Sequence, residues 1–411
     1  MALAEGYSRG THFRTKEIPE APDAQYHGAF VLDPKPGVFD GVANFDFASL
    51  YPSVFTTFNV SPDTFVPHDD APGFDPSKLT TCPRFEIEGE AVGGSIFMRE
   101  PLGVLPTIYK RVADERRRCK LEMAKYAVDS GEWWRWKREE YAYKQLGLSI
   151  YGCMGSVYSR YFNADVAEAV TLTSQFLIRA TMIRAKELGY ESLYGDTDSV
   201  FLKMPETAAA DFLKEAAKLY EEIAARSGCA KNLIELEYEQ YFSRIALLKK
   251  KRYFGRLVVQ KGRPADRIEV KGLESQRSDG IAVTRRVQRD LMKGIVKDGW
   301  DESVVRRLLL KIREGVFSGS LTADECAVTS TLTKAPSAYK LRTPHVELAK
   351  RMEAEGREVY VGSKIAYVVI DGRKPPLETL SVEEYVASGA KYDPYYFWMM
   401  NLLCHSRPLY K

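Results

Sequence analysis

The sequence contains no two cysteines in a Cys-x-x-Cys arrangement, and this absence excludes two kinds of metal site. Zinc ribbons and many iron–sulfur clusters are held by cysteine pairs of that spacing, so we expect neither. Isolated cysteines are typical of a reducing compartment, so we do not expect a disulfide framework either. The six cysteines are Cys82, Cys119, Cys153, Cys229, Cys326 and Cys404.

Long apolar runs are also lacking. No stretch reaches the roughly 18 consecutive apolar residues that a membrane-spanning helix needs. The sequence also has no leader in which a charged segment precedes an apolar one. We therefore expect neither a transmembrane span nor a secretory signal, and we predict a cytoplasmic protein with no membrane partner.

Net charge is small, at +3 for 411 residues, so it does not by itself indicate a nucleic-acid-binding protein. The local distribution is more informative, because basic residues cluster at 116–120, 249–252 and 261–263. A protein that holds both DNA and metal ions needs the two signs of charge in separate places. A near-neutral total is therefore compatible with that role.

Composition is that of an ordinary globular protein, with 45% hydrophobic and 28% charged residues and no apparent internal repeat. The length exceeds that at which a single core stops growing, so two or three subdomains are expected. The pattern of apolar residues predicts helices at 105–128, 132–151, 163–188, 207–226 and 281–314, strands at 28–33, 233–248 and 253–260 and near 359–370, and a loop at 67–83.

Two aspartates lie at the centre of the most informative segment, YGDTDSVF at 194–201. Apolar and aromatic residues flank a short polar centre, which predicts a β-hairpin. Asp196 and Asp198 are two residues apart, so on an extended segment their side chains would point to the same side. Two carboxylates at one spot repel each other unless a cation lies there.

A third carboxylate, Asp46, lies between Phe45 and Phe47 in an apolar segment. Burying it there without a partner would be costly. Three such carboxylates could hold a pair of Mg²⁺ ions, which prefer oxygen ligands. Each signal is weak alone, because Asp is common in turns and Asp-Thr-Asp also fits a turn with solvated carboxylates.

Taken in order, the motifs of this chain resemble family B DNA polymerases. DFASLYPS at 46–53 is similar to the family's first palm motif, KQLGLSIYG at 144–152 to its fingers motif, and YGDTDS at 194–199 to its second palm motif. The further similar segments are YHGA at 26–29 (the link between exonuclease and polymerase parts), NVSP at 59–62, KKRYFG at 250–255 and KGLESQRSD at 271–279 (palm–thumb motifs that grip the duplex), and LTKAPSAYKLRTPHVELAKR at 332–351 (a thumb segment).

The resemblance implies an α+β protein with the right-hand polymerase fold. In that fold the palm is built on an antiparallel sheet, the fingers are a helical hairpin and the thumb is mostly helical. The expected divisions are an N-terminal arm or linker at 1–25, palm at 26–104 and 153–280, fingers at 105–152 and thumb at 281–411.

The resemblance also implies a DNA-directed DNA polymerase core, which adds dNTPs to a primer 3′ end by two-metal nucleotidyl transfer. Asp46 and Asp198 would be the principal metal ligands, Asp196 a nearby third carboxylate, and the backbone carbonyl of Phe47 an additional ligand. The implied cofactors are two Mg²⁺ ions, for which Mn²⁺ could substitute. One ion would activate the 3′-hydroxyl and the other would support the leaving pyrophosphate.

The nucleotide site implied by the resemblance combines backbone amides, an aromatic ring and cations. Tyr51 would lie under the sugar and exclude a 2′-hydroxyl, so deoxynucleotides would be selected. Cations of two antiparallel helices would neutralise the triphosphate. Outside these motifs, Tyr51 would be interpreted as a core aromatic and the cations as solvated charges. The expected nucleotide-binding residues are Ser49, Leu50, Tyr51, Arg116, Lys120, Lys144, Leu148 and Tyr151.

One position departs from the family pattern. The family usually has Asn four residues after the fingers lysine, whereas this chain has Leu148. Leucine can pack but cannot hydrogen-bond, so the contact of that amide must be lost or supplied elsewhere. We therefore expect altered base discrimination rather than loss of the chemical step, because the metal ligands are intact.

Contacts to primer–template DNA are expected mainly at phosphates and in the minor groove, which makes binding independent of sequence and sensitive to salt. A basic run is more often a solvated surface, but its place in the motif order favours DNA contact. The expected DNA-binding residues are Tyr26, Gly28, Gly152, Lys250, Lys251, Arg252, Tyr253, Lys271 and Arg277.

Only 25 residues precede Tyr26, which is too few for a nuclease domain, so we expect no proofreading nuclease in this chain. It could be a natural exonuclease-less enzyme, one chain of a split polymerase, or a shortened form of a longer chain. A separate exonuclease-bearing chain or a sliding clamp could be its partner. Tyr151 and Asp196 are 45 positions apart, which leaves no room for the insertion of protein-primed members. We expect an ordinary primer, in a prokaryotic cytoplasm or in viral or phage replication in the host cytoplasm.

Two other interpretations stay open. One is a catalytically silent, polymerase-like scaffold that binds DNA or partner proteins, although such a scaffold would not need Asp46 and Asp198. The other is a polymerase that makes or copies RNA. Tyr51 argues against ribonucleotide use, but the sequence does not reveal the type of template.

Overall fold

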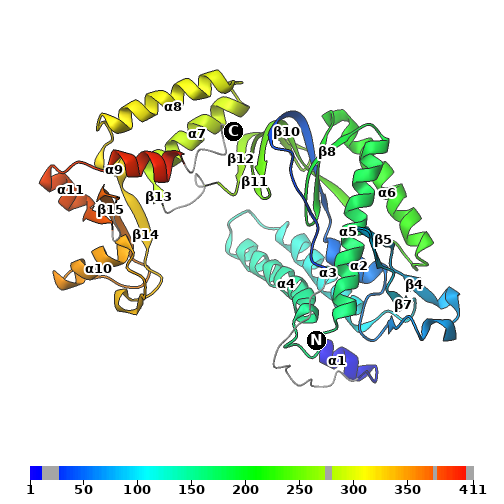
Figure 1. Cartoon of the computed structure of the whole chain (residues 1–411). Coiled ribbons are helices and arrows are strands. Elements are labelled where there is room, and N and C mark those ends of the chain that lie inside the picture. The colour runs from blue at the N-terminus through cyan, green and yellow to red at the C-terminus, as the bar shows by residue number, and fades with distance from the viewer. Residues whose placement is uncertain (12–26, 274–279, 374–376, 404–411) are drawn as a thin grey trace. The chain divides into compact units, whose positions relative to one another are not determined.

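The computed structural model describes residues 1–11, 27–273, 280–373 and 377–403, and no helix within these ranges is long and apolar enough to cross a membrane. The chain forms two compact units (Figure 1). The first unit contains residues 1–33, 41–241 and 260–262, and the second contains residues 34–40, 242–259 and 263–411. Both mix helices with strands, as the sequence predicts.

An antiparallel sheet supports the first unit. Its strands lie in the order β1-β8-β9-β2-β10, and β1 with β8, β8 with β9 and β9 with β2 pair antiparallel. The last seven residues of β2 and the first six of β10 belong to this unit. The bounds of the strands are β1 (Val31–Leu32), β2 (Gly37–Phe47), β8 (Glu191–Asp196), β9 (Ser199–Lys203) and β10 (Leu236–Lys249).

Helix α6 (Ala209–Arg226) packs on this sheet through aromatic residues, and helix α5 (Ala164–Glu187) contacts β8 and β9 of the same sheet. The ring of Phe45 on β2 lies 5.0 Å from that of Phe212 on α6, and the ring of Phe47 lies 5.5 Å from that of Tyr220. The buried hydroxyls of Tyr220 and Thr181 share a hydrogen bond of 2.7 Å, which joins the two helices. Burial of these rings fixes the strand that carries Asp46.

A helical hairpin, α3 (Val104–Met123) and α4 (Gly131–Gly155), projects from the first unit (Figure 1). The break between the predicted helices is confirmed: Asp129 has a positive φ, and Ser130 caps α4 by accepting a hydrogen bond from the amide of Trp133. The buried carboxylate of Glu140 on α4 accepts a hydrogen bond from Arg116 on α3, at 2.7 Å.

The arm or linker expected at 1–25 contains a helix in its described part, held by an ion pair between Glu5 and Arg111 on α3. One sequence expectation for the first unit needs correction. Residues 67–83 are not all loop. The remaining elements of this unit are α1 (Ala2–Ser8), α2 (Leu50–Thr57), β3 (Phe65–Val66), η1 (Ala71–Gly73), η2 (Pro76–Lys78), β4 (Leu79–Thr81), β5 (Arg84–Ile87), β6 (Glu90–Gly93), β7 (Ile96–Met98) and η3 (Glu206–Ala208).

The second unit contains the strand order β10-β11-β12 and a separate sheet in the order β13-β14-β15-β16. The predicted helix at 281–314 is wrong as a single element, because Gly299 takes a positive φ and the chain turns between two helices. The elements are β11 (Arg252–Gln260), β12 (Arg263–Lys271), β13 (Gly280–Ile281), α7 (Ala282–Val296), α8 (Glu302–Phe317), α9 (Ala323–Cys326), β14 (Val328–Thr331), η5 (Pro336–Ala338), α10 (Pro344–Ala354), β15 (Lys364–Asp371), β16 (Glu378–Ser381), α11 (Val382–Ser388) and a π-helix, η6 (Tyr396–Leu403).

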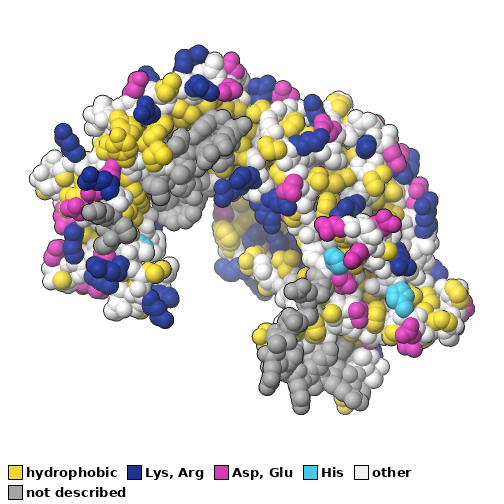
Figure 2. Space-filling model, in the orientation of Figure 1, with side chains coloured by type: hydrophobic (Ala, Val, Ile, Leu, Met, Phe, Trp, Pro, Cys, Tyr) yellow, Lys and Arg dark blue, Asp and Glu magenta, His cyan; other side chains and the backbone are white. Residues whose placement is uncertain are grey.

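Charge is mixed on the surface of each unit. On the face shown in Figure 2, Lys and Arg side chains lie among Asp and Glu side chains on both units. This distribution agrees with the small net charge of the sequence.

Candidate active site

Asp196 and Asp198 lie where β8 turns into β9. Strand β8 ends at Asp196 and β9 begins at Ser199, so Thr197 and Asp198 form a two-residue turn. Thr197 has a positive φ, which takes the chain out of the extended conformation. The hairpin is confirmed, but Asp196 and Asp198 do not lie on one continuous extended segment, so the period-two argument for their side chains does not apply.

Asp46 is placed beside this turn by its strand register. Ser199 is the antiparallel partner both of Asp46 on β2 and of Asp196 on β8. Since neighbouring strands are about 4.8 Å apart, Asp46 and Asp196 are separated by roughly 10 Å of sheet. The turn itself folds toward β2, because the amide of Phe47 donates to the carbonyl of Asp198 at 2.8 Å. Asp198, rather than Asp196, therefore lies next to Asp46.

The electrostatics of Asp46 reflect this arrangement. Burial of the half-buried carboxyl, followed by the negative charges of Asp198, Glu239 and Glu237, raises its pKa to about 7. The positive charge of Lys261 acts in the opposite direction. A carboxyl with this environment has carboxylate neighbours but little compensating positive charge, and a bound cation would remove that imbalance.

Glu237, Glu239 and Lys261 are neighbours of Asp46 that sequence reasoning missed. The two glutamates lie two residues apart on β10, and Lys261 is held to Glu239 by an ion pair of 3.1 Å. A signal was present in the sequence, because the segment LIELEYE at 233–239 alternates acidic and apolar residues from Glu235 to Glu239 within a predicted strand. Only the pairing of β10 beside β2 makes that acidic face relevant to Asp46.

Asp196 is engaged in local hydrogen bonds. Its carboxylate accepts from the hydroxyl of Tyr194 at 3.1 Å and from the hydroxyl of Thr197 at 3.1 Å. Within the described ranges, no three His, Cys, Asp or Glu side chains form a group ready to hold a metal ion. Asp46 and Asp198 thus provide the core of a candidate metal site, and Asp196 would have to reorient to join them.

Helix α2 begins directly after the strand of Asp46. Its N-cap, Ser49, has a left-handed conformation with φ 55° and ψ 59°, which is uncommon for a residue other than glycine. Amides in the first turn of a helix lack partners within that helix and point toward its N-terminal end, where they can bind an anion. Leu50 and Tyr51 occupy this first turn, so the amide roles expected at 49–51 have a suitable position.

The two tyrosines expected at the nucleotide meet. The rings of Tyr51 on α2 and Tyr151 on α4 are 4.7 Å apart in an edge-on arrangement. Leu148, one turn earlier on α4, is 62% exposed. The side chain at the position of the family's usual asparagine is therefore accessible to solvent.

The three cations expected from the helical hairpin are differently engaged. Arg116 donates to Glu140, whereas Lys120 and Lys144 are exposed. Burial raises the pKa of Glu140, but the hydrogen bond from Arg116 and the charges of Arg116, Lys137 and Lys120 outweigh burial and hold the pKa below its usual value. Contact of Arg116 with a triphosphate would require it to share or leave this carboxylate.

Residues expected to contact DNA lie on several elements. Lys250 and Lys251 form the turn between β10 and β11, and Lys251 has a positive φ. Tyr253 is buried and packs edge-on against Phe242, while Arg252 and Lys271 are exposed. Lys271 lies 3.7 Å from a carboxylate oxygen of Glu269. Tyr26 and Arg277 lie outside the described residues.

Two glycines, Gly28 and Gly152, are also expected to contact DNA. The carbonyl of Gly28 accepts a hydrogen bond from the side-chain amide of Gln175 on α5, at 2.8 Å. Gly152 lies on α4, and a Cβ placed there would meet open space. Their roles in DNA binding stay predictions.

Comparison with known families decides the relationship. The model of DNA polymerase family B matches residues 8–402. The chain belongs to DNA polymerase family B. This family B chain is 33% identical over 359 residues to a DNA polymerase of Archaeoglobus fulgidus, with 86% of this chain and 42% of the relative covered. It is also 33% identical to DNA polymerase 2 of Aeropyrum pernix, with 92% and 44% covered.

A solved structure agrees with this family B assignment. The family B DNA polymerase of Pyrobaculum calidifontis is similar with a TM-score of 0.67 and 27% identity, over 100% of this chain and 50% of that polymerase. The chain spans about half the length of the curated relatives that it matches.

Proposed function

We propose that this chain is the catalytic core of a DNA-directed DNA polymerase, which adds dNTPs to the 3′ end of a primer on a DNA template. The single observation that carries the proposal is the convergence of Asp46 and Asp198, which come from two separate family motifs and meet through the bond between the Phe47 amide and the Asp198 carbonyl. Membership of family B and relatives named DNA polymerase support the same activity.

The proposed subdomains follow the expected boundaries. The palm comprises 26–104 and 153–280, with Asp46 and Asp198 on its antiparallel strands. The helical hairpin at 105–152 is the fingers, the mostly helical segment at 281–411 is the thumb, and 1–25 is an N-terminal arm. Helices α3 and α4 together cover most of the range 105–152, which supports the fingers assignment.

Family B DNA polymerases are metal-dependent enzymes. The fit to a metal is supported by the raised pKa of Asp46, which marks a half-buried carboxyl surrounded by other acids. Asp46, Asp198 and the carbonyl of Phe47 would hold two Mg²⁺ ions, with Asp196 as a further carboxylate, and Mn²⁺ could substitute. When bound, such ions lower the pKa of the attacking hydroxyl and neutralise charge on the leaving group.

The nucleotide is proposed to lie between the start of α2 and the exposed face of α4. Amides at Ser49, Leu50 and Tyr51 would bind the triphosphate, as helix N-termini bind anions. Lys120, Lys144 and Arg116 would add positive charge. The packed rings of Tyr51 and Tyr151 would form the floor beneath the sugar and the base pair, which supports selection of deoxynucleotides.

DNA is proposed to bind through the exposed cations Lys250, Lys251, Arg252 and Lys271, with Tyr253 acting from within the strand pair as packing. Tyr26, Gly28, Gly152 and Arg277 remain part of the proposed DNA surface. Cytoplasmic replication, and a separate exonuclease-bearing chain or sliding clamp as partner, also remain proposals.

Primer extension with Mg²⁺ and four dNTPs tests the proposed activity. The wild-type chain should extend a primer on a DNA template, and Asp198→Ala should not. A scaffold without catalytic function would bind the duplex but extend no primer, and that result would overturn the proposal.

A further inference from the structure

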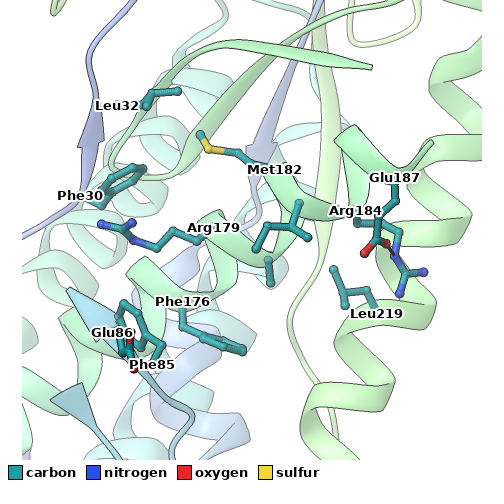
Figure 3. A pocket seen from close by; sticks show the side chains of 12 residues that line it. Phe30, Leu32, Phe85, Glu86, Phe176, Arg179, Met182, Arg184, Glu187 and Leu219 are labelled. Atoms are coloured by element: carbon teal, nitrogen blue, oxygen red, sulfur yellow. Dashed lines mark ion pairs between the residues drawn. The ribbon is translucent and has the colours of Figure 1, made fainter. Parts of the chain in front are cut away.

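A pocket lies on the surface of α5, with Phe30 and Leu32 at one side of it (Figure 3). It encloses about 540 Å³, which is within the range of sites for small molecules. Most of its wall is apolar and comes from four parts of the first unit. The principal apolar residues are Phe30, Leu32, Phe85, Phe176, Met182 and Leu219.

One cation of this wall, Arg179, has no ion pair with a carboxylate among the described residues. The guanidinium of Arg179 lies over the ring of Phe30 at 4.3 Å and near that of Phe85 at 5.9 Å, as Figure 3 shows. Its Nε atom is buried and has no hydrogen-bond partner among the described residues. An unmade hydrogen bond of a buried donor is costly, so an acceptor that entered the pocket would be stabilised here.

The second arginine of the wall provides a contrast. Arg184 lies 3.0 Å from a carboxylate oxygen of Glu187 and 3.6 Å from one of Glu215. Its charge is already compensated, as is that of Glu187. The remaining carboxylate of the wall, Glu86, is exposed and can stay hydrated. Arg179 is therefore the group available to an acidic ligand.

The pocket wall is also part of the support of the catalytic hairpin. The carbonyl of Phe30 accepts from the amide of Thr197 at 3.0 Å, and Leu32 is the strand partner of Gly195. Met182 closes the same side, because a Cβ built on Gly195 would lie 2.5 Å from its terminal methyl group. A ligand that packs on Phe30, Leu32 and Met182 would therefore stabilise the hairpin.

We propose that this pocket binds a small apolar ligand with one acidic group, which pairs with Arg179, and that occupancy stabilises the hairpin at Tyr194–Asp198. The apolar walls take the body of the ligand, and its carboxylate, sulfonate or similar group accepts hydrogen bonds from the guanidinium. The binding step does not depend on the proposed polymerase activity, because the pocket is separate from Asp46 and the start of α2.

The probe for this site is 8-anilinonaphthalene-1-sulfonate, which combines an aromatic body with one sulfonate and fluoresces when it leaves water. Wild-type chain should bind it saturably, and Arg179→Met should bind it about tenfold more weakly, since one charge-assisted hydrogen bond is lost. Arg184→Met is the matched control on the same helix and should bind as wild type does. Equal affinity of the wild type and Arg179→Met would overturn the proposal.

Hydrogen exchange in the presence of the probe tests the link to the hairpin. Exchange of the peptide that contains Tyr194–Asp198 should slow in wild type when the probe is bound, and should change little in Arg179→Met at the same probe concentration. Ala180→Trp fills the pocket and should abolish binding; circular dichroism would establish that this variant is folded. Unchanged exchange of the hairpin at saturating probe would overturn the proposed coupling.

Discussion

At the scale of single residues, Asp46 combines a structural cost with a proposed function. Its pKa is raised to about 7 by burial and then by the charges of Asp198, Glu239 and Glu237. A carboxyl whose pKa is higher in the folded than in the unfolded chain destabilises the fold when it is ionised. This cost is absent below the ordinary pKa of 3.8, grows as the pH rises, and is complete above about 7.

Asp46→Asn should therefore stabilise the metal-free protein. At pH 8 we expect the free energy of unfolding to rise by ~1–2 kcal/mol, allowing for solvent screening of a half-buried group. The gain should vanish toward pH 4, where the wild-type carboxyl is protonated. Urea unfolding at both pH values, in EDTA, measures it; a loss of stability at pH 8 would contradict the electrostatic explanation.

Metal addition gives the complementary result. Ligand carboxylates must be ionised to bind a cation, so Mg²⁺ should raise the melting temperature of the wild type more at pH 8 than at pH 6. Asp46→Asn should respond little at either pH. An equal response of the two proteins would place the metal elsewhere.

Tyr51 is the second residue for which the structure gives a specific prediction. Its ring is held by Tyr151 at 4.7 Å, so it is positioned to exclude a 2′-hydroxyl from the proposed sugar site. Tyr51→Ala should raise the efficiency of rNTP incorporation relative to dNTP incorporation by ten-fold or more, that is by over ~1.4 kcal/mol of discrimination. Tyr51→Phe is the matched control, because it keeps the ring. If rNTP use did not rise in the alanine variant, the proposed role would be wrong.

Residue identities were readable from the sequence where a motif contained them, as with Asp46 and Asp198. The conformation of the Asp-Thr-Asp segment could not be predicted from the sequence, because the same three residues fit both a two-residue turn and an extended strand. Glu237, Glu239 and Lys261 were missed for another reason. Their significance depends on strand pairing and on the β11–β12 turn, both of which are long-range features.

At the scale of secondary-structure elements, the α3–α4 hairpin depends on a buried ionic contact. Glu140 is 5% exposed and is paired with Arg116 at 2.7 Å and with Lys137 at 3.5 Å. Its pKa lies below the usual value, so its stabilising contribution is present above about 4.5 and is lost as the pH falls through the lower folded pKa.

Glu140→Gln should lower the free energy of unfolding by ~1–3 kcal/mol at pH 7, because charge-assisted hydrogen bonds are lost at a buried site. The neighbouring Glu139→Gln is the matched control, since its contact with Arg118 is longer and partly exposed, and it should cost less than ~1 kcal/mol. Urea unfolding measures both. If both variants lost the same free energy of unfolding, the buried contact would contribute no more to stability than the exposed one.

Leu148 lies on α4 of the same hairpin, and we expect it to affect the accuracy of nucleotide incorporation. Leu148→Asn changes an exposed helical position, so stability should fall by no more than ~0.7 kcal/mol. The restored amide should change the misincorporation spectrum during primer extension, with Leu148→Ala as the control that removes packing without adding an amide. Identical error spectra of the wild type and Leu148→Asn would refute the proposed role in base discrimination.

The elements themselves were largely predictable, because α3, α4, α5, α6, β10 and β11 have clear apolar periodicity. Helix α1 and the division of 281–314 were not predicted. The first is a short helix whose stability comes from the contact of Glu5 with Arg111, and the second depends on the positive φ of Gly299. A tertiary contact and a backbone conformation thus determine these two features, which the local pattern of apolar residues does not predict.

At the scale of the whole molecule, the motif order in the sequence already indicated family B, and the family model and the solved relative confirmed it. The mixed α and β architecture was predicted correctly. The division into two compact units arises from long-range packing around three separated segments of chain, which periodicity does not reveal.

The central claim is that Asp46 and Asp198 form the catalytic pair, with Asp196 in a lesser role. Single-nucleotide addition with Mg²⁺, measured by rapid quench for wild type, Asp198→Asn and Asp196→Asn at saturating primer–template, tests it most directly. Asp198→Asn should lose at least ~10³-fold in rate, whereas Asp196→Asn should lose less than ~10²-fold, with DNA affinity unchanged in both. Wild-type rates in Asp198→Asn, or a greater loss in Asp196→Asn, would contradict the proposed site.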